Sequence, residues 1–175
     1  NSKLIYSGSS TKFCDDGKGA FLSPYTLSKA QNTDLLVSFG EWFNLNYAIV
    51  YFYNVYGGRE ISSGQYATVI AKYLSLINSG SKVLPVTLPG TQKRNFTHIK
   101  DVIKALLLVG EYAKGDGFGI GHDKSYSILE ICDLLNCKPK FFAANPANRH
   151  GGPVVTEKTQ ALGWMPTNNL EEYLV

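Results

Sequence analysis

The stretch Leu22-Ser23-Pro24-Tyr25-Thr26-Leu27-Ser28-Lys29, residues 22–29, decides how the rest of this chain is interpreted. Proline suits the first turn of a helix, where its missing N–H leaves no hydrogen bond unmade, and a serine before it is a favoured N-cap. We therefore predict a helix that begins at Pro24 and runs to about residue 44. Residues four positions apart share a helix face, so this helix presents Tyr25 and Lys29 side by side.

A tyrosine beside a lysine is a candidate proton-transfer pair. An ammonium group favours the ionised form of a nearby phenol, which can then exchange protons with a substrate. The alternative is a packed aromatic residue beside a solvated lysine, and in a chain with 11 tyrosines this spacing alone is weak evidence. The sequence before the helix favours catalysis: an apolar strand over residues 3–7 leads into a polar cluster, from which the Ser9 hydroxyl can hold a substrate hydroxyl.

A second strand is expected in the almost wholly apolar run Tyr47-Ala48-Ile49-Val50-Tyr51-Phe52-Tyr53. Such runs are typical of strands buried on both faces of a parallel sheet. Strand, helix and strand thus follow one another within 55 residues, which predicts an α/β fold with a parallel sheet. Ligands bind at the carboxyl ends of such strands, where Asn54 stands as a binding residue or as an ordinary turn asparagine.

Size and charge exclude several classes of protein. The 175 residues are 44% hydrophobic and 18% charged, which indicates a folded domain, and a net charge of +3 is too small to argue for nucleic-acid binding. No apolar run reaches the length of a membrane span, so we expect no membrane association. The three cysteines follow no metal-ligand pattern, which predicts no metal and a cytoplasmic protein with reduced thiols. The chain opens almost directly in a strand, and we expect it to be a fragment.

The remaining chain is predicted to add a smaller α/β region. A helix is expected over residues 64–78, followed by an interrupted edge strand over residues 82–88. Arg94 can fork onto a phosphate, although a surface arginine is the more frequent case. Asp101 is expected to cap or charge the start of an apolar helix, and Ser127 with Glu130 forms a capping box.

The order of these segments resembles the extended short-chain dehydrogenase/reductase family, specifically its NAD-dependent nucleotide-sugar epimerases and dehydratases such as the UDP-glucose 4-epimerases. The resemblance covers the whole chain and rests on five motifs in the same order. These are Tyr6-Ser7-Gly8-Ser9-Ser10-Thr11, Pro24-Tyr25-Thr26-Leu27-Ser28-Lys29, Tyr51-Phe52-Tyr53-Asn54-Val55-Tyr56-Gly57, Gly90-Thr91-Gln92-Lys93-Arg94-Asn95-Phe96-Thr97-His98-Ile99-Lys100-Asp101 and Leu162-Gly163-Trp164-Met165-Pro166.

The resemblance implies a role for each matched residue. Ser9, Tyr25 and Lys29 match the catalytic residues, which also contact NAD, and Tyr53 matches a residue lining the nicotinamide. Substrate-binding positions of the family are matched by Asn54, Gln65, Arg94 and Arg149. The implied reaction is transient oxidation of a sugar hydroxyl, in which tyrosine exchanges the proton and hydride passes to NAD. The implied partner is a nucleotide-diphosphate sugar.

Departures from the family pattern limit this expectation. The glycine-rich half that binds the adenosine part of NAD has no counterpart here, so we expect this chain alone to bind NAD poorly. Ser10 and Thr11 replace the Asp-Glu pair of the dehydratases, which favours an epimerase. Thr87 replaces an aromatic residue near the nucleotide base, so the sequence does not specify which base is bound. Alternatives are a dehydratase or reductase, a non-catalytic nucleotide-sugar binding module, and a structural fragment.

The resemblance also implies a partial Rossmann-type parallel sheet with a small α/β substrate-binding domain. Residues 1–60 and 94–121 are expected to complete the dinucleotide-binding layer, and residues 61–93 and 122–175 to build the sugar-nucleotide side. The helix that carries Tyr25 is expected to lie in a homodimer interface, through Phe39, Trp42 and Phe43, or to pack on the chain's own sheet.

Overall fold

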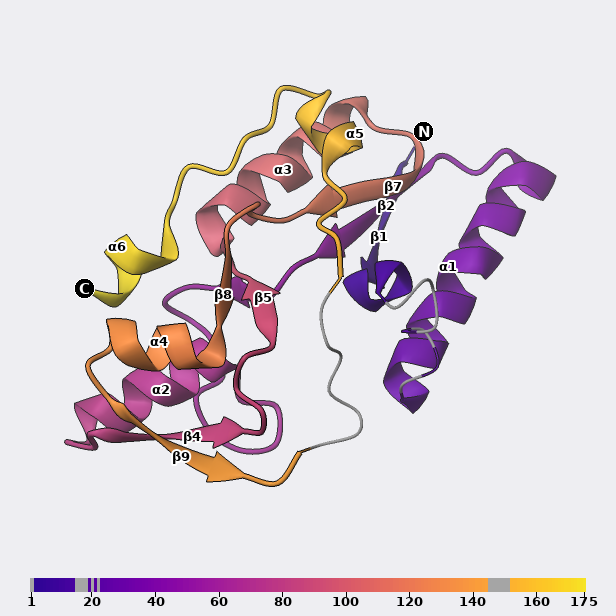
Figure 1. Ribbon diagram of the computed structural model, residues 1–175. Helices are drawn as coiled ribbons and strands as arrows, with labels where there is room; N and C mark the ends of the chain where they lie inside the picture. The colour runs from indigo at the N-terminus through magenta and orange to yellow at the C-terminus, as the bar shows by residue number, and fades with distance from the viewer. Residues whose placement is uncertain (1, 15–18, 20, 22, 145–151) are drawn as a thin grey trace.

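A parallel sheet forms one half of the molecule (Figure 1). The computed structural model describes residues 2–14, 19, 21, 23–144 and 152–175. Among them, strands β1 (Leu4–Ser9), β2 (Tyr47–Phe52) and β7 (Gly115–Ile120) pair in parallel in the order β1-β2-β7. The central strand β2 is buried on both faces from Tyr47 to Tyr51, which confirms the prediction made from its apolar run.

Two long helices cover opposite faces of this sheet. Alternate side chains of a strand point to opposite faces. Accordingly Tyr47, Ile49 and Tyr51 pack toward α1 (Pro24–Phe43), and Ala48 and Val50 pack toward α3 (Ile99–Tyr112). Figure 1 shows α1 and α3 on either side of the sheet. The predicted first helix is therefore confirmed, and it ends where Asn44 takes a left-handed conformation with φ of 50°.

A second hydrophobic core lies in the other half of the molecule. It is built from α2 (Val69–Asn78), α4 (Ile128–Leu134) and α6 (Leu170–Leu174) against β4 (Val83–Thr87). The exposed strand β9 (Lys138–Phe142) pairs with β4 in parallel. The antiparallel pair β5 (Lys93–Asn95) and β8 (Ser125–Ser127) runs from this core toward the sheet. The short pair β3 (Val55–Tyr56) and β6 (Thr97–His98) also joins the halves. The proposed domain boundaries stay a prediction.

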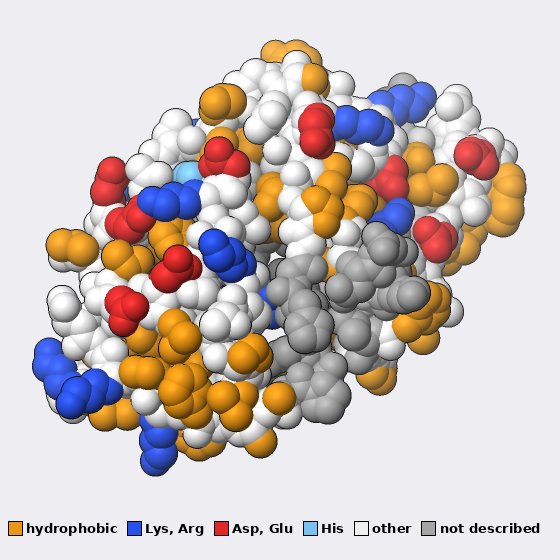
Figure 2. Space-filling model, in the orientation of Figure 1, with side chains coloured by type: hydrophobic (Ala, Val, Ile, Leu, Met, Phe, Trp, Pro, Cys, Tyr) orange, Lys and Arg blue, Asp and Glu red, His pale blue; other side chains and the backbone are white. Residues whose placement is uncertain are grey.

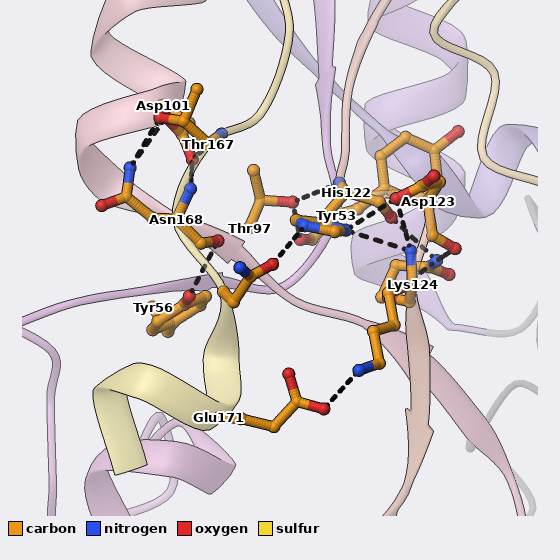
Figure 3. A network of polar contacts seen from close by, with 12 residues as sticks. Tyr53, Tyr56, Thr97, Asp101, His122, Asp123, Lys124, Thr167, Asn168 and Glu171 are labelled. Carbon is orange, nitrogen blue, oxygen red and sulfur yellow. Dashed lines mark hydrogen bonds and ion pairs between the residues drawn. The ribbon is translucent and has the colours of Figure 1, made fainter. Parts of the chain in front are cut away.

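The C-terminal segment is tied to the start of α3 by a buried carboxylate (Figure 3). The Asp101 side chain is fully buried and accepts four hydrogen bonds of 2.9–3.1 Å from the backbone and side-chain groups of Thr167 and Asn168. The indole of Trp164 donates to the Asp101 carbonyl at 2.9 Å. The prediction that Asp101 charges the helix start is confirmed, but His98 is the residue that caps α3.

Other differences from the predictions are local. Helix α2 begins at Val69 instead of residue 64, because Gly64 has φ of 79°, which a helix does not accommodate. The capping box of Ser127 and Glu130 is confirmed. Short helices η1 (Ser10–Phe13) and α5 (Glu157–Gln160) complete the described elements. None of the described helices is long and apolar enough to span a bilayer.

Candidate active site

The Ser9 hydroxyl lies at the carboxyl end of β1, the edge of a parallel sheet at which ligands bind. Ser9 is the last residue of the strand and the N-cap of η1. Its Oγ lies 2.7 Å from Thr11 Oγ1 and accepts a longer hydrogen bond of 3.4 Å from the Thr11 backbone N–H. The hydroxyl is half-buried, so it stays within reach of a ligand.

The start of α1 places Tyr25 and Lys29 on one side of the helix. Ser23 Oγ accepts from the Thr26 N–H at 3.2 Å, and Thr26 Oγ1 accepts from the Ser23 N–H at 2.9 Å, so the first turn is capped reciprocally. Pro24 follows the cap, as the sequence predicts. The Tyr25 side chain is 62% exposed, and its ring is therefore open to a ligand or to another part of the protein.

Lys29 connects this helix to the strand that carries Ser9. Its Nζ donates to the Ser7 carbonyl at 2.9 Å and lies 5.0 Å from the centre of the Tyr6 ring. The ammonium is thereby held beside β1, two residues before Ser9. Within the part of the chain that the structure describes, no hydrogen bond joins the Tyr25 hydroxyl to Ser9 or Lys29. The structure thus brings Lys29 and Ser9 to one strand end and leaves Tyr25 one helical turn away.

A separate pocket of about 240 Å³ collects candidate substrate-binding residues. Asn54 and Arg94 line it, as does Thr87. Asn54 has φ of 39°, and its side-chain amide donates to the Asn95 carbonyl at 2.7 Å, which holds it at the end of β2. This observation shows that part of the Asn54 amide has a structural role, while the residue still faces the pocket.

Several pocket residues were not singled out from the sequence, among them a cation and an amide. Lys72 enters from α2 as a second cation beside Arg94, and Gln92 enters from the turn before β5. The Gln92 NH₂ group donates to the Thr87 carbonyl at 3.3 Å, whereas its buried Oε1 has no partner among the described residues. Lys72 follows the pocket residue Val69 by three positions and so shares its helix face, but no sequence signal marked this face as a binding face.

The other predicted binding residues lie in different surroundings. Tyr53 is buried directly after β2, and its hydroxyl accepts from the Val155 N–H at 3.0 Å. Gln65 is exposed in the turn before α2 and does not line the 240 Å³ pocket. Arg149 lies outside the described residues. The structure therefore places Asn54 and Arg94 together and does not bring Gln65 to them.

Most of the chain matches the sequence model of a known protein family. Residues 2–121 match the model described as the NAD dependent epimerase/dehydratase family. The chain belongs to this family. The match includes both ends of the candidate site, from Ser9 on β1 to Arg94 on β5.

Individual members of the family are similar over most of this chain. A putative UDP-glucose 4-epimerase of Methanocaldococcus jannaschii is 29% identical over 86% of the chain and 50% of its own length. A dTDP-D-glucose 4,6-dehydratase of Bos taurus is 28% identical over 93% of the chain and 48% of its own length. A solved UDP-N-acetylglucosamine 4-epimerase of Methanobrevibacter ruminantium superimposes with a TM-score of 0.85 at 25% identity, over 99% of the chain and 60% of that structure. The chain thus spans about half the length of the curated relatives it matches.

The residues of this epimerase/dehydratase chain fit one end of the NAD cofactor. Lys29 uses one of its three N–H donors on Ser7, which leaves two donors that suit hydroxyl groups such as those of a ribose, and the exposed Tyr25 ring lies one helical turn away. Among the described residues, no glycine-rich turn links a strand to a helix in the way that cradles a pyrophosphate. The described chain therefore offers hydrogen-bond donors that suit a ribose hydroxyl, and no glycine-rich cradle for a pyrophosphate.

Proposed function

We propose that this chain is the catalytic and substrate-binding part of an NAD-dependent nucleotide-sugar epimerase, of the type that inverts a sugar carbon after transient oxidation, usually C4. The observation that carries the proposal is the bond from Lys29 Nζ to the Ser7 carbonyl. It fixes a cation at the strand end that presents Ser9, with the exposed Tyr25 ring one helical turn away. This arrangement supplies a proton acceptor, a cation and a hydroxyl on neighbouring elements.

The chain's own residues manage the proton. The Tyr25 phenolate accepts the proton of the sugar hydroxyl as the C–H bond of the same carbon breaks, and it returns that proton when the carbonyl is reduced again. NAD, when bound, would supply the hydride acceptor for the oxidation and, once reduced, the hydride donor for the reduction. The Ser9 hydroxyl is proposed to orient the sugar oxygen, and Lys29 holds a positive charge beside the strand that carries Ser9. Tyr53 is proposed to support the nicotinamide side of the cofactor.

The pocket that holds Asn54 and Arg94 is proposed to take the nucleotide part of the substrate. Two cations, Lys72 and Arg94, line it with an amide, which suits a diphosphate. Gln65 and Arg149 remain proposed substrate contacts, on the family resemblance alone.

An epimerase is favoured over a dehydratase by the residues that follow Ser9. Ser10 and Thr11 carry hydroxyl groups and no carboxylate, so they do not provide the acid and base needed to eliminate water. A reductase or a dehydratase with another acid–base pair is the alternative within the family.

The competing proposal from another class is a binding module that holds a nucleotide sugar without hydride transfer. It is favoured by the lack, among the described residues, of a glycine-rich turn that would cradle the pyrophosphate of the cofactor. Calorimetric titration with UDP-glucose and dTDP-glucose, with and without NAD, distinguishes the two proposals. An epimerase is expected to bind the nucleotide sugar more tightly when NAD is present, whereas the affinity of a binding module is expected not to change with NAD. Turnover of both sugars by the native protein at its natural length is the decisive second measurement.

We further propose a cytoplasmic homodimer. The C-terminal half of α1 exposes Phe39, Trp42 and Phe43, whose rings contact one another, and Figure 2 shows hydrophobic side chains at the edge of the molecule over this end of α1. The cysteines of the described chain are free thiols, as a reducing compartment would keep them. Light scattering of wild type and Trp42→Glu tests the dimer, since a charge on this surface is expected to give a monomer.

A further inference from the structure

Thr11 makes the shortest side-chain contact of the candidate catalytic serine. The Thr11 Oγ1 and Ser9 Oγ atoms are 2.7 Å apart, which is an ordinary distance for a good hydrogen bond between hydroxyl groups. The Thr11 backbone N–H also points at Ser9 Oγ, at 3.4 Å. Both polar groups of Thr11 that can donate a hydrogen therefore converge on the same oxygen.

The direction of this hydrogen bond decides whether the Ser9 hydrogen remains available to a substrate. Serine Oγ has one hydrogen to donate and two lone pairs with which to accept. If the Thr11 hydroxyl donates, Thr11 engages both lone pairs of Ser9, and the Ser9 hydrogen is directed to another acceptor. If Ser9 donates instead, its hydrogen is used inside the turn and is lost to a substrate.

The turn that carries this pair is fixed from its other side. Lys12 is the next residue of η1, and its Nζ contacts Asp116 Oδ2 at 3.1 Å and the Tyr51 hydroxyl at 3.4 Å. Tyr51 in turn donates to Asp116 Oδ1 at 2.6 Å. Because these partners lie on β2 and β7, η1 is anchored to the sheet next to the Ser9–Thr11 contact.

We propose that Thr11 is a positioning residue that donates its hydroxyl hydrogen to Ser9 Oγ and so directs the Ser9 hydrogen toward the reacting oxygen of the sugar. This inference rests on the proposed epimerase function. The reacting oxygen gains negative charge as its proton passes to Tyr25, and a donor aimed at that oxygen stabilises the transition state more than the ground state. Thr11 itself forms and breaks no covalent bond.

The test is a set of variants in the native protein at its natural length, assayed with NAD and a nucleotide sugar that the wild type turns over. Thr11→Val keeps the shape of the side chain and removes the hydroxyl, and we expect kcat to fall about tenfold with KM unchanged, which corresponds to the loss of one hydrogen bond. Thr11→Ser restores the hydroxyl and is expected to restore kcat. Thr11→Ala is the second variant in case valine disturbs the turn.

A double-mutant cycle with Ser9→Ala separates positioning from a general effect on the fold. If Thr11 acts through Ser9, Thr11→Val is expected to have no further effect on kcat once Ser9 is alanine. A wild-type kcat for Thr11→Val with a low kcat for Ser9→Ala overturns this inference and leaves the proposed function standing. An equal loss in both backgrounds also overturns it. If the native protein turns over no nucleotide sugar with NAD, the proposed function fails, and this inference fails with it.

Discussion

Replacing Asp101 by asparagine is expected to destabilise the protein strongly, although the shape of the side chain hardly changes. The carboxylate is fully buried, and each of its oxygens accepts two hydrogen bonds: Oδ2 from the backbone N–H groups of Thr167 and Asn168, and Oδ1 from their side chains. An asparagine keeps one oxygen and places an NH₂ group at the other position. In either orientation of the amide, two of the four donors from Thr167 and Asn168 face the NH₂ group and lose their acceptor.

The magnitude follows from these two lost bonds. A hydrogen bond to a charged group contributes about 1.5–3 kcal/mol, so the loss of two is expected to lower the free energy of unfolding by about 3–6 kcal/mol. Lys104 Nζ, 3.6 Å from Asp101 Oδ1, loses its ion pair as well, but its exposed side chain makes that contribution small.

Urea unfolding followed by tryptophan fluorescence measures this change. Trp164 is buried and donates its indole N–H to the Asp101 carbonyl, so its emission reports on this part of the molecule. Asp133→Asn on the exposed side of α4 is the matched control, because it removes the same charge without a buried site. Equal unfolding midpoints for Asp101→Asn and Asp133→Asn would refute the reasoning that this carboxylate anchors the C-terminal segment.

Three further predictions concern stability. Burial raises the pKa of Asp101, but the hydrogen bonds from Asn168 and Thr167 outweigh burial, so the pKa is lowered in the folded protein. The carboxylate therefore contributes its full stability above the unfolded pKa of about 3.9 and loses it as the pH falls further. The difference in the free energy of unfolding between wild type and Asp101→Asn should accordingly narrow below about pH 4. A difference in the free energy of unfolding that stays constant down to the pH of acid unfolding would contradict this prediction. Gly119→Ala would place a Cβ 1.7 Å from the Val155 carbonyl oxygen and should cost about 3 kcal/mol or more, whereas Gly58→Ala, with open space around it, serves as a control in the same thermal melt. Tyr51→Phe removes the hydroxyl bonded to Asp116 and should cost about 1–2 kcal/mol in urea unfolding, while the exposed Tyr66→Phe should cost nothing measurable.

Local sequence signals predicted the elements that carry the candidate active site. The Ser23 cap and Pro24 located the start of α1, and the apolar run from Tyr47 located the buried strand β2. Both signals act over a few residues, through capping and through burial on two faces, so they can be identified without knowledge of the fold.

Contacts between distant segments could not be predicted in the same way. The bonds from Thr167 and Asn168 to Asp101 join residues 66 and 67 positions apart, and nothing in the composition of either segment specifies the partner. Gln92 likewise lines the pocket because the turn before β5 lies near α2 and the end of β2, and the local sequence does not specify that arrangement. Sequence reasoning therefore located the proposed catalytic residues and missed part of the proposed substrate pocket.

The most direct test of the proposed function is the turnover of a nucleotide sugar by the native protein at its natural length, compared between wild type and Tyr25→Phe, with Tyr66→Phe as the control. Phenylalanine keeps the ring and removes the group that is proposed to exchange the proton. We expect the rate to fall about a hundredfold or more, the range that general acid–base catalysis contributes. An unchanged rate for Tyr25→Phe would contradict the proposed mechanism.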